Sequence, residues 1–391
     1  MKNYRWFYVV LGMLIFLCLG TVYSWSIFRK PLENVLHFSS TQSGLPFMTF
    51  LAFYAILMPF GGKLVTRYHP RTVMVLGGSL VGLGWFLASF AKSIWFLVLT
   101  YGVIAGSGVG IVYGVPISVV SRWFYDKKGL ALGILLSGFG LSPFITAPIA
   151  KKFIDLYGVF TTFKILGGIF LIFIIILSLP FKFPDEIKHE EEISGSSLNP
   201  KEMLKTAKFY ALWFCFMVGT LVGLMIIGIT GPVGEEIIKI DSKKVALFVS
   251  IFSAFNGIGR PLFGWLTDVL KPVFVISLSY LLILLSSFLM FLFKEGSVVV
   301  FTLSFALFWL NFGGWLSIAP ALTSRFFGNK FYSQNYGIVF TAYGFGAIIG
   351  NLLSGILKDY FGSYKVIAYP TIFIVIIAFI VANKFLKEEN R

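Results

Sequence analysis

Long apolar stretches without a charged side chain recur along almost the entire chain of 391 residues, and this feature restricts the fold more than any other. An α-helix needs about 20 apolar residues to cross the hydrocarbon core of a bilayer. Twelve stretches have a suitable length, and only the eighth contains a charge, Arg260. They are 6–28, 38–62, 72–91, 93–121, 129–150, 165–181, 209–234, 245–267, 272–293, 296–324, 331–357 and 366–383. We therefore expect an all-α integral membrane protein with twelve transmembrane helices.

The composition favours a membrane protein over a soluble one. Only 13% of the residues are charged, whereas soluble domains have about 25%. The net charge of +15 would suggest a nucleic-acid partner for a soluble protein. Here the basic residues separate apolar stretches instead of gathering with aromatic residues on one face. We expect the chain to lie in the lipid bilayer and to have no nucleic-acid partner.

The distribution of Lys and Arg predicts the orientation in the membrane. If the N-terminus is cytoplasmic, the inner segments carry more basic residues than the outer ones, including five lysines in the polar segment 182–208. The start of the chain, MKNYRWFYVV, leads into the first apolar stretch without a clear cleavage site, so we expect a retained first helix. The sequence thus predicts a multi-pass protein of the plasma or inner membrane with both termini in the cytoplasm.

Two short motifs occur twice at nearly the same spacing. PFGGKLVT (59–66) returns as PLFGWLTD (261–268), 202 residues later. SRWF (121–124) returns as SRFF (324–327), 203 residues later. Such repeats indicate two copies of one structural unit. We expect two pseudo-symmetric six-helix bundles, 1–181 and 209–391, joined by a cytoplasmic linker, 182–208.

The twelve helices, the central linker and the repeated Gly-x-Leu-x-[Thr/Asp] motif resemble the major facilitator superfamily. Within it, the segments GTVYSWSIFRKPL (20–32), SRWFYDKKGLALGI (121–134) and RPLFGW (260–265) are similar to the oxalate/formate antiporter family and related monocarboxylate transporters. The resemblance covers essentially the whole chain. It implies the major facilitator fold and secondary transport by alternating access, with substrate held in a central cavity.

The repeated motif is implied by the resemblance to act as a conformational latch on the cytoplasmic side. Its residues here are Gly62, Arg67, Arg71, Gly264 and Asp268. The first copy departs from the family pattern, because Thr66 stands where the second copy has Asp268. We therefore expect the second copy to carry most of the latch.

Arg260 lies well inside the eighth apolar stretch, where a charge costs roughly 2.5–3.5 kcal/mol on insertion scales. Such a residue is expected to face a water-filled cavity and to bind an anion. Two alternatives are an arginine that reaches the membrane surface and one that pairs with a carboxylate of another helix. None of the 17 acidic residues lies in the middle of an apolar stretch, which favours the transported anion as partner. A carboxylate fits, because a guanidinium binds both of its oxygens.

Two further positions, compared with the families that this chain resembles, restrict the range of expected substrates. Proton-coupled monocarboxylate transporters commonly have an aspartate four residues before this arginine, and here the residue is Asn256, which does not titrate. Oxalate exchangers have a lysine in the eleventh helix, and the corresponding residue is Tyr343. One fixed positive charge favours a monocarboxylate such as formate or lactate over oxalate. The coupling is left open between anion exchange and proton symport.

Other side chains are candidates to line the substrate site. Asn256 lies one helical turn from Arg260 and could bond either the arginine or the ligand. A small acid also needs a compact pocket with a few hydroxyl or amide groups. Each further candidate is explained equally well by ordinary packing; they are Tyr23, Tyr113, Asn311, Trp315 and Tyr343.

The apolar stretches contain no pairing of nucleophile and base and no cluster of His, Asp and Glu, so an enzyme is not expected. For the same reason we expect no catalytic residue, metal or cofactor. The expected partners are a small carboxylate anion and, in the case of symport, a proton, and a monomer should suffice for function. The remaining alternatives are an oxalate/formate exchanger, or a major facilitator transporter for an unrelated solute in which Arg260 is structural.

Overall fold

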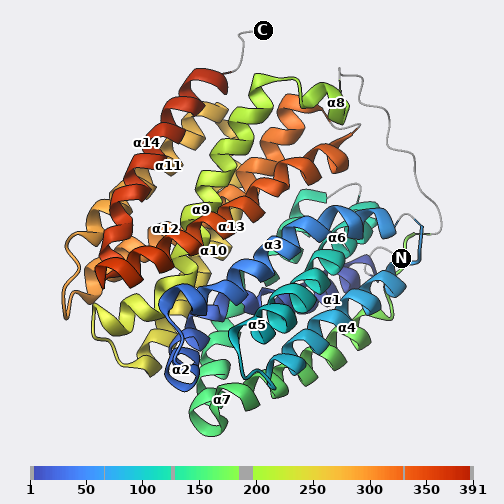
Figure 1. Cartoon of the computed structure of the whole chain (residues 1–391). Coiled ribbons are helices and arrows are strands. Elements are labelled where there is room, and N and C mark those ends of the chain that lie inside the picture. Colours follow the sequence, from blue (N-terminus) through green and yellow to red (C-terminus); the bar gives the residue numbers. More distant parts are fainter. Residues whose placement is uncertain (1–3, 66, 125–127, 185–196, 329–330, 388–391) are drawn as a thin grey trace. The chain divides into compact units, whose positions relative to one another are not determined.

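The computed structural model describes residues 4–65, 67–124, 128–184, 197–328 and 331–387. Within these ranges every regular element is a helix, as Figure 1 shows. The chain divides into two compact units, Met1–His189 and Glu190–Arg391. Thr66 of the first motif lies outside the described residues. The predicted all-helical class is confirmed.

The first unit begins with a helix that changes its winding in the last third of the predicted first span, 6–28. α1 (Tyr4–Leu19) runs through a 3₁₀ turn, η1 (Gly20–Ser24), into α2 (Trp25–Leu36). Gly20 packs so closely on α7 that a methyl group there would lie 2.7 Å from the side chain of Ser142. This close contact accounts for glycine at the position where the winding changes.

With the exception of α7, the other helices of the first unit follow the predicted spans closely. Capping explains two of their starts: Ser39 accepts a hydrogen bond from the backbone of Gln42, and Ser93 accepts one from Phe96. Eight residues of the fourth span form a π-helix, the rare winding that often marks a local irregularity. The elements are α3 (Ser40–Leu64), α4 (Pro70–Ala88), α5 (Ile94–Leu97), η2 (Val98–Ala105), α6 (Gly106–Trp123) and α7 (Lys128–Ser178).

α7 contains both the fifth and the sixth predicted spans, and this corrects the predicted gap between them. Helix continues on both sides until Gly158, where φ is +78°, a conformation that favours glycine. Lys151 and Asp155 form an ion pair of 2.5 Å across one helical turn. The charges that ended the apolar stretch therefore end the membrane-compatible part and not the helix. Eleven described helices are long and apolar enough to cross a membrane, with Ala131–Ser178 counted as one of them.

The second unit repeats this plan. After the short α8 (Pro200–Met203) come α9 (Ala207–Glu236), α10 (Ser242–Val269), α11 (Pro272–Met290), α12 (Val298–Phe327), α13 (Tyr332–Phe361), η3 (Tyr364–Ile367) and α14 (Ala368–Phe385). The largest sets of contacts in this unit join α10 to α12 and α9 to α13. α12 also packs on α11 and on α9, so it lies at the centre of the unit.

The last residues of the segment predicted as linker, 182–208, make contacts with helices of the second unit. The backbone N–H of Leu198 donates to the carbonyl of Phe327, and the side chain of Asn335 donates to the carbonyl of Leu198 at 2.9 Å. Asn199 caps α8 in a capping box with Glu202. In this stretch Asn199 therefore caps α8, and the backbone of Leu198 bonds to the end of α12 and to the start of α13.

The internal repeat is visible in how corresponding helices touch. In the first unit, Gly110 of α6 packs on the backbone carbonyl of Tyr54 in α3. In the second unit, Gly313 of α12 packs on the backbone carbonyl of Asn256 in α10. Each pair lies 202 or 203 residues from its counterpart, as do the two sequence motifs. The same helix–helix contact thus occurs once in each unit, at the spacing that the motifs predict.

Seven residues further along α3 and one residue further along α6, the two copies exchange their large and small residues. In the first unit, Gly61 of α3 accommodates Ile111 of α6, and a methyl group at Gly61 would lie 2.9 Å from the Cα of Ile111. In the second unit, the large residue is Phe263 of α10 and the glycine is Gly314 of α12, with 2.5 Å between a methyl at Gly314 and the ring of Phe263. Such complementary packing keeps the helices close in both copies.

Candidate functional site

Arg260 lies on the side of α10 that faces the protein. Only 7% of the residue is exposed, and its Nε and Nη2 atoms are buried. At about 100° per residue, the exposed stripe of this helix lies roughly opposite; it consists of Leu247, Ile258, Leu262, Trp265 and Val269. Arg260 therefore does not extend from a lipid-facing position to the membrane surface, which was one of the two alternatives.

Asn256 lies one turn before Arg260 and is completely buried. Neither amide atom, Nδ2 or Oδ1, has a hydrogen-bond partner in the described part of the chain. An unsatisfied buried polar group costs roughly 1–3 kcal/mol. A methyl group at Gly313 would lie 2.8 Å from Oδ1, so the amide rests against the glycine surface of α12. Asn256 therefore offers a donor group and an acceptor that the described residues do not use.

Asn311, the other predicted asparagine, has a different environment. Its Oδ1 accepts a hydrogen bond of 2.8 Å from Ser279 of α11, and its Nδ2 donates to the carbonyl of Leu307 at 2.7 Å. The residue is 1% exposed. Its amide thus joins α12 to α11, and binding of substrate by Asn311 remains a prediction that these contacts do not support.

Trp315 is buried where α12 meets α9 and α11. The edge of its indole fills the space beside Gly219, and its ring lies 5.4 Å from that of Tyr280. The indole Nε1 is buried without a hydrogen-bond partner among the described residues. Trp315 is therefore held by packing, and its single donor makes no hydrogen bond within that part of the chain.

Tyr343 is fully buried in α13. Its ring stacks on Phe340 at 4.9 Å and lies 6.3 Å from the ring of Phe312 in α12. Tyr343, which stands where oxalate exchangers have a lysine, therefore lies among aromatic side chains where α12 meets α13.

Tyr23 and Tyr113 belong to the first unit, where the structure brings them together. Both rings meet Phe139 of α7 edge-on, at 5.2 and 5.4 Å. Tyr54 of α3 joins the same group, 5.2 Å from Tyr113 and 6.0 Å from Phe139. Tyr54 was not predicted, although the 202-residue repeat could have found it, because it corresponds to Asn256.

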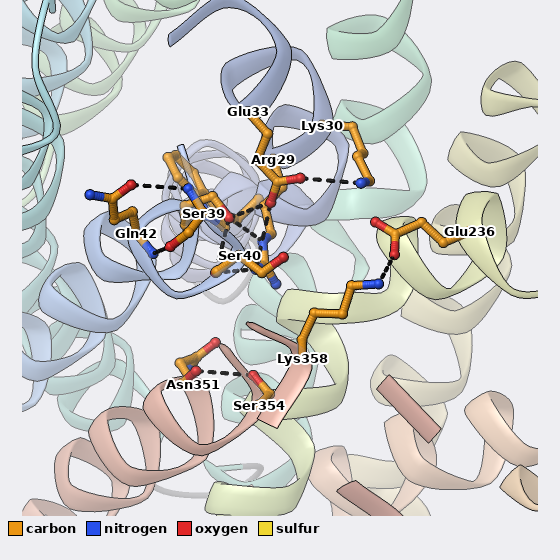
Figure 2. A network of polar contacts seen from close by, with 12 residues as sticks. Arg29, Lys30, Glu33, Ser39, Ser40, Gln42, Glu236, Asn351, Ser354 and Lys358 are labelled. Atoms are coloured by element: carbon orange, nitrogen blue, oxygen red, sulfur yellow. Dashed lines mark hydrogen bonds and ion pairs between the residues drawn. The ribbon is translucent and has the colours of Figure 1, made fainter. Parts of the chain in front are cut away.

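Arg29 is a second buried arginine that the sequence did not single out. It is 1% exposed and lies in α2, where Figure 2 shows its polar network. Its Nε donates to Ser43 Oγ at 3.1 Å, and its Nη2 donates to the carbonyl of Ser40 at 2.6 Å and lies 3.9 Å from Glu33. Lys30 also pairs with Glu33, at 3.2 Å. This arginine fastens α2 to the start of α3, and the Arg–Glu spacing of four residues was its sequence signal.

The predicted latch segments are the last turns of helices and not loops. α3 ends at Leu64 and α10 at Val269, so most of each motif is helical. A methyl group at Gly62 would meet nothing within 4 Å, and one at Gly264 would make only ordinary contact with Ser317. Arg67, Arg71 and Asp268 are exposed.

The two repeated motifs meet in the second unit. Arg325 of SRFF donates through Nη1 to the carbonyl of Thr267 at 3.1 Å, in the last turn of α10. A cation at this end of a helix satisfies a terminal carbonyl and interacts favourably with the helix dipole. In the first unit, Arg122 of SRWF instead lies 4.0 Å above the ring of Phe183. The latch function of both copies remains a prediction.

The comparisons with known proteins agree with this architecture. The family model described as Major Facilitator Superfamily matches residues 5–324 and 219–391. The oxalate:formate antiporter of Oxalobacter formigenes is 30% identical over 365 residues, covering 92% of this chain and 86% of that protein. Monocarboxylate transporter 12-B of Danio rerio is 25% identical, covering 85% and 76%.

A solved structure shows the same fold at low sequence identity. A bacterial homologue of the human lysosomal transporter Spinster, in an inward-facing and occupied conformation, superimposes with a TM-score of 0.78 at 15% identity, covering all of both chains. Together with the repeated helix contacts and the family match, this establishes the family: the chain belongs to the Major Facilitator Superfamily.

Proposed function

We propose that this chain is a secondary transporter of small organic anions, with monocarboxylates of the formate or lactate type as substrates, and that Arg260 binds the substrate carboxylate. Relatives in the family include an oxalate:formate antiporter and monocarboxylate transporters. The main observation in support of this site is that Arg260 and Asn256 lie one turn apart on the buried side of α10. The buried amide of Asn256 makes no hydrogen bond to the described residues.

The chemistry of the two side chains suits a carboxylate. A guanidinium donates two parallel hydrogen bonds to the two carboxylate oxygens, and such charged bonds are stronger than neutral ones. The Asn256 amide, one turn away, supplies a further donor for a carboxylate oxygen and an acceptor for a hydroxyl such as that of lactate. A ligand that bonds to this amide removes the cost of leaving a buried polar group without a partner. These features favour binding of a hydroxylated or simple monocarboxylate.

The single positive charge among the proposed substrate residues favours a monoanion. Tyr343 stands at the position that implied a second cation, and it is packed against Phe340. A dianion would bring one carboxylate into a region without a second fixed charge from the proposed residues. The oxalate/formate exchanger is the second candidate, and the name of the Oxalobacter relative favours it.

Asn256 also bears on the coupling, because an amide does not take up a proton near neutral pH. We therefore favour anion exchange, or symport in which the substrate itself carries the proton. The proposed setting is the plasma or inner membrane with both termini cytoplasmic, with a monomer as the functional form and no enzymatic activity. Alternating access requires two units that keep their internal packing, and the glycine contacts of Gly110 and Gly313 support such rigidity.

Uptake into proteoliposomes tests the proposal. Formate, lactate, acetate and oxalate are compared for the native chain and for Arg260→Gln and Arg260→Lys, with Lys244→Gln at the exposed start of α10 as matched control. Loss of a charged hydrogen bond is expected to lower monocarboxylate uptake by about 100-fold in Arg260→Gln, with partial recovery in Arg260→Lys. Uptake by Arg260→Gln equal to that of Lys244→Gln would make Arg260 a structural residue.

The same vesicles separate the two forms of coupling. Uptake that requires a counter-anion inside and is insensitive to a pH gradient indicates exchange. Uptake driven by an inward proton gradient without internal anion indicates symport.

A further inference from the structure

An apolar groove of about 420 Å³ lies on the surface of the second unit, between the start of α9 and the end of α14. These two helices lie side by side (Figure 1). Its lining residues include Ala207, Ala211 and Phe214 of α9 and Val381 and Phe385 of α14. Its volume lies within the range of about 300–1,000 Å³ that is usual for small-molecule sites. The groove is far too apolar to bind a carboxylate substrate.

Basic residues lie within two residues of the lining residues Ala207 and Phe385 in the sequence. Lys205 lies two residues before α9 begins, Lys384 lies in the last turn of α14, and Lys387 follows that helix. All three are exposed. Glu202, the acidic residue nearest in sequence among those described, accepts a hydrogen bond from the backbone of Asn199 and so serves as part of a helix cap. An anionic phospholipid matches this arrangement, because its acyl chain suits the apolar groove and its negatively charged headgroup suits the lysines.

We propose that this groove binds one acyl chain of an anionic phospholipid, whose phosphate is held by the lysines at the ends of α9 and α14. The exposed rim residue Tyr210, at 60% exposure, adds an aromatic group of the kind that anchors proteins at a membrane interface. None of its lining residues lies on α10, which carries Arg260 and Asn256, and the lipid is proposed as a structural ligand. It is a specific lipid site that fixes α14 to α9.

Native mass spectrometry of the full chain tests this. The protein is equilibrated in detergent with equal amounts of phosphatidylglycerol and phosphatidylcholine that have identical acyl chains. We expect one retained phosphatidylglycerol per chain and a clear preference over phosphatidylcholine. Because each basic residue contributes a factor of about 5 to the attraction, Lys205→Gln with Lys384→Gln should reduce the preference about 25-fold. The matched control, Lys243→Gln with Lys244→Gln at the exposed start of α10, should retain it.

Filling the groove tests the place of the acyl chain. Ala207→Phe on α9 and, independently, Val381→Phe on α14 should each abolish retention of the lipid, and two variants on different helices guard against a folding defect in one. Glycerol phosphate, which has the headgroup but no chain, should not displace the lipid. Equal retention of both lipids, full displacement by glycerol phosphate, or unchanged retention in the filled variants would each overturn the proposal.

Discussion

Two asparagines in the second unit show why burial alone does not define a binding residue. Asn311 uses both ends of its amide, with Ser279 as donor and Leu307 as acceptor. Asn256 is as deeply buried and uses neither end within the described ranges. Sequence identified both candidates and also Arg260, because polar side chains stand out in an apolar stretch. It did not separate them, since the partner that engages Asn311 lies on a helix more than 30 residues away in the chain.

Replacing Asn256 with aspartate should give the transporter a pH dependence. An ionised carboxylate at this position, one turn from Arg260, would pair with the guanidinium and compete with the substrate carboxylate. The uptake of Asn256→Asp relative to the native chain should fall by about 10-fold or more at high pH and rise as pH falls and the introduced carboxylate is protonated. The measurement is formate uptake at a series of pH values, with Asn256→Ser as control. If the ratio of variant to native uptake is the same at every pH, Asn256 does not lie next to the bound substrate.

The helix pairs α3–α6 and α10–α12 illustrate what repetition preserves at the scale of elements. Gly110 and Gly313 keep the same backbone contact, whereas the pair Gly61 and Ile111 is reversed in size in the second copy. Glycines recur at every fourth position from Gly102 to Gly114, a spacing that lets two helices approach closely. The spacing alone does not show that a methyl group at Gly114 would meet nothing within 4 Å, whereas one at Gly110 would meet the backbone of Tyr54.

Two alanine substitutions therefore have opposite expected effects. Gly313→Ala places a methyl group against the carbonyl of Asn256, and overpacking of this kind costs about 1–3 kcal/mol. Gly114→Ala meets open space in a helix and should be neutral or stabilising by up to about 1 kcal/mol. Thermal unfolding in detergent, with transport measured in parallel, compares them. Equal stability of the two variants would show that the α10–α12 contact is looser than described.

At the scale of the whole molecule, the sequence predicted the class, the family and the spans well, because lipid imposes a minimum apolar length on each helix. It placed helix ends less well. Charged residues end an apolar stretch without ending a helix, as Lys151 and Asp155 do in α7, where the break comes at Gly158. The polar composition of 182–208 likewise did not reveal that Asn199 caps a short helix, α8.

The predicted orientation has a direct test by cysteine labelling. In a background with Cys18→Ser and Cys215→Ala, single cysteines are introduced at Lys294, between α11 and α12, and at Lys387, after α14; both lysines are exposed. A membrane-impermeant maleimide should label the first in intact cells and the second only after permeabilisation, because the excess of basic residues predicts a cytoplasmic C-terminus. The reverse pattern contradicts the proposed orientation.

The central claim is that Arg260 holds the carboxylate of the substrate, and binding measured without transport tests it most directly. The unfolding temperature of the purified chain is followed while formate or lactate is added, with formamide or lactamide as uncharged analogues. Because a ligand that binds only the folded state stabilises it, the acids should raise the unfolding temperature of the native chain while the amides should not. Arg260→Gln should show no increase with either. An undiminished increase with formate or lactate in Arg260→Gln would contradict the account.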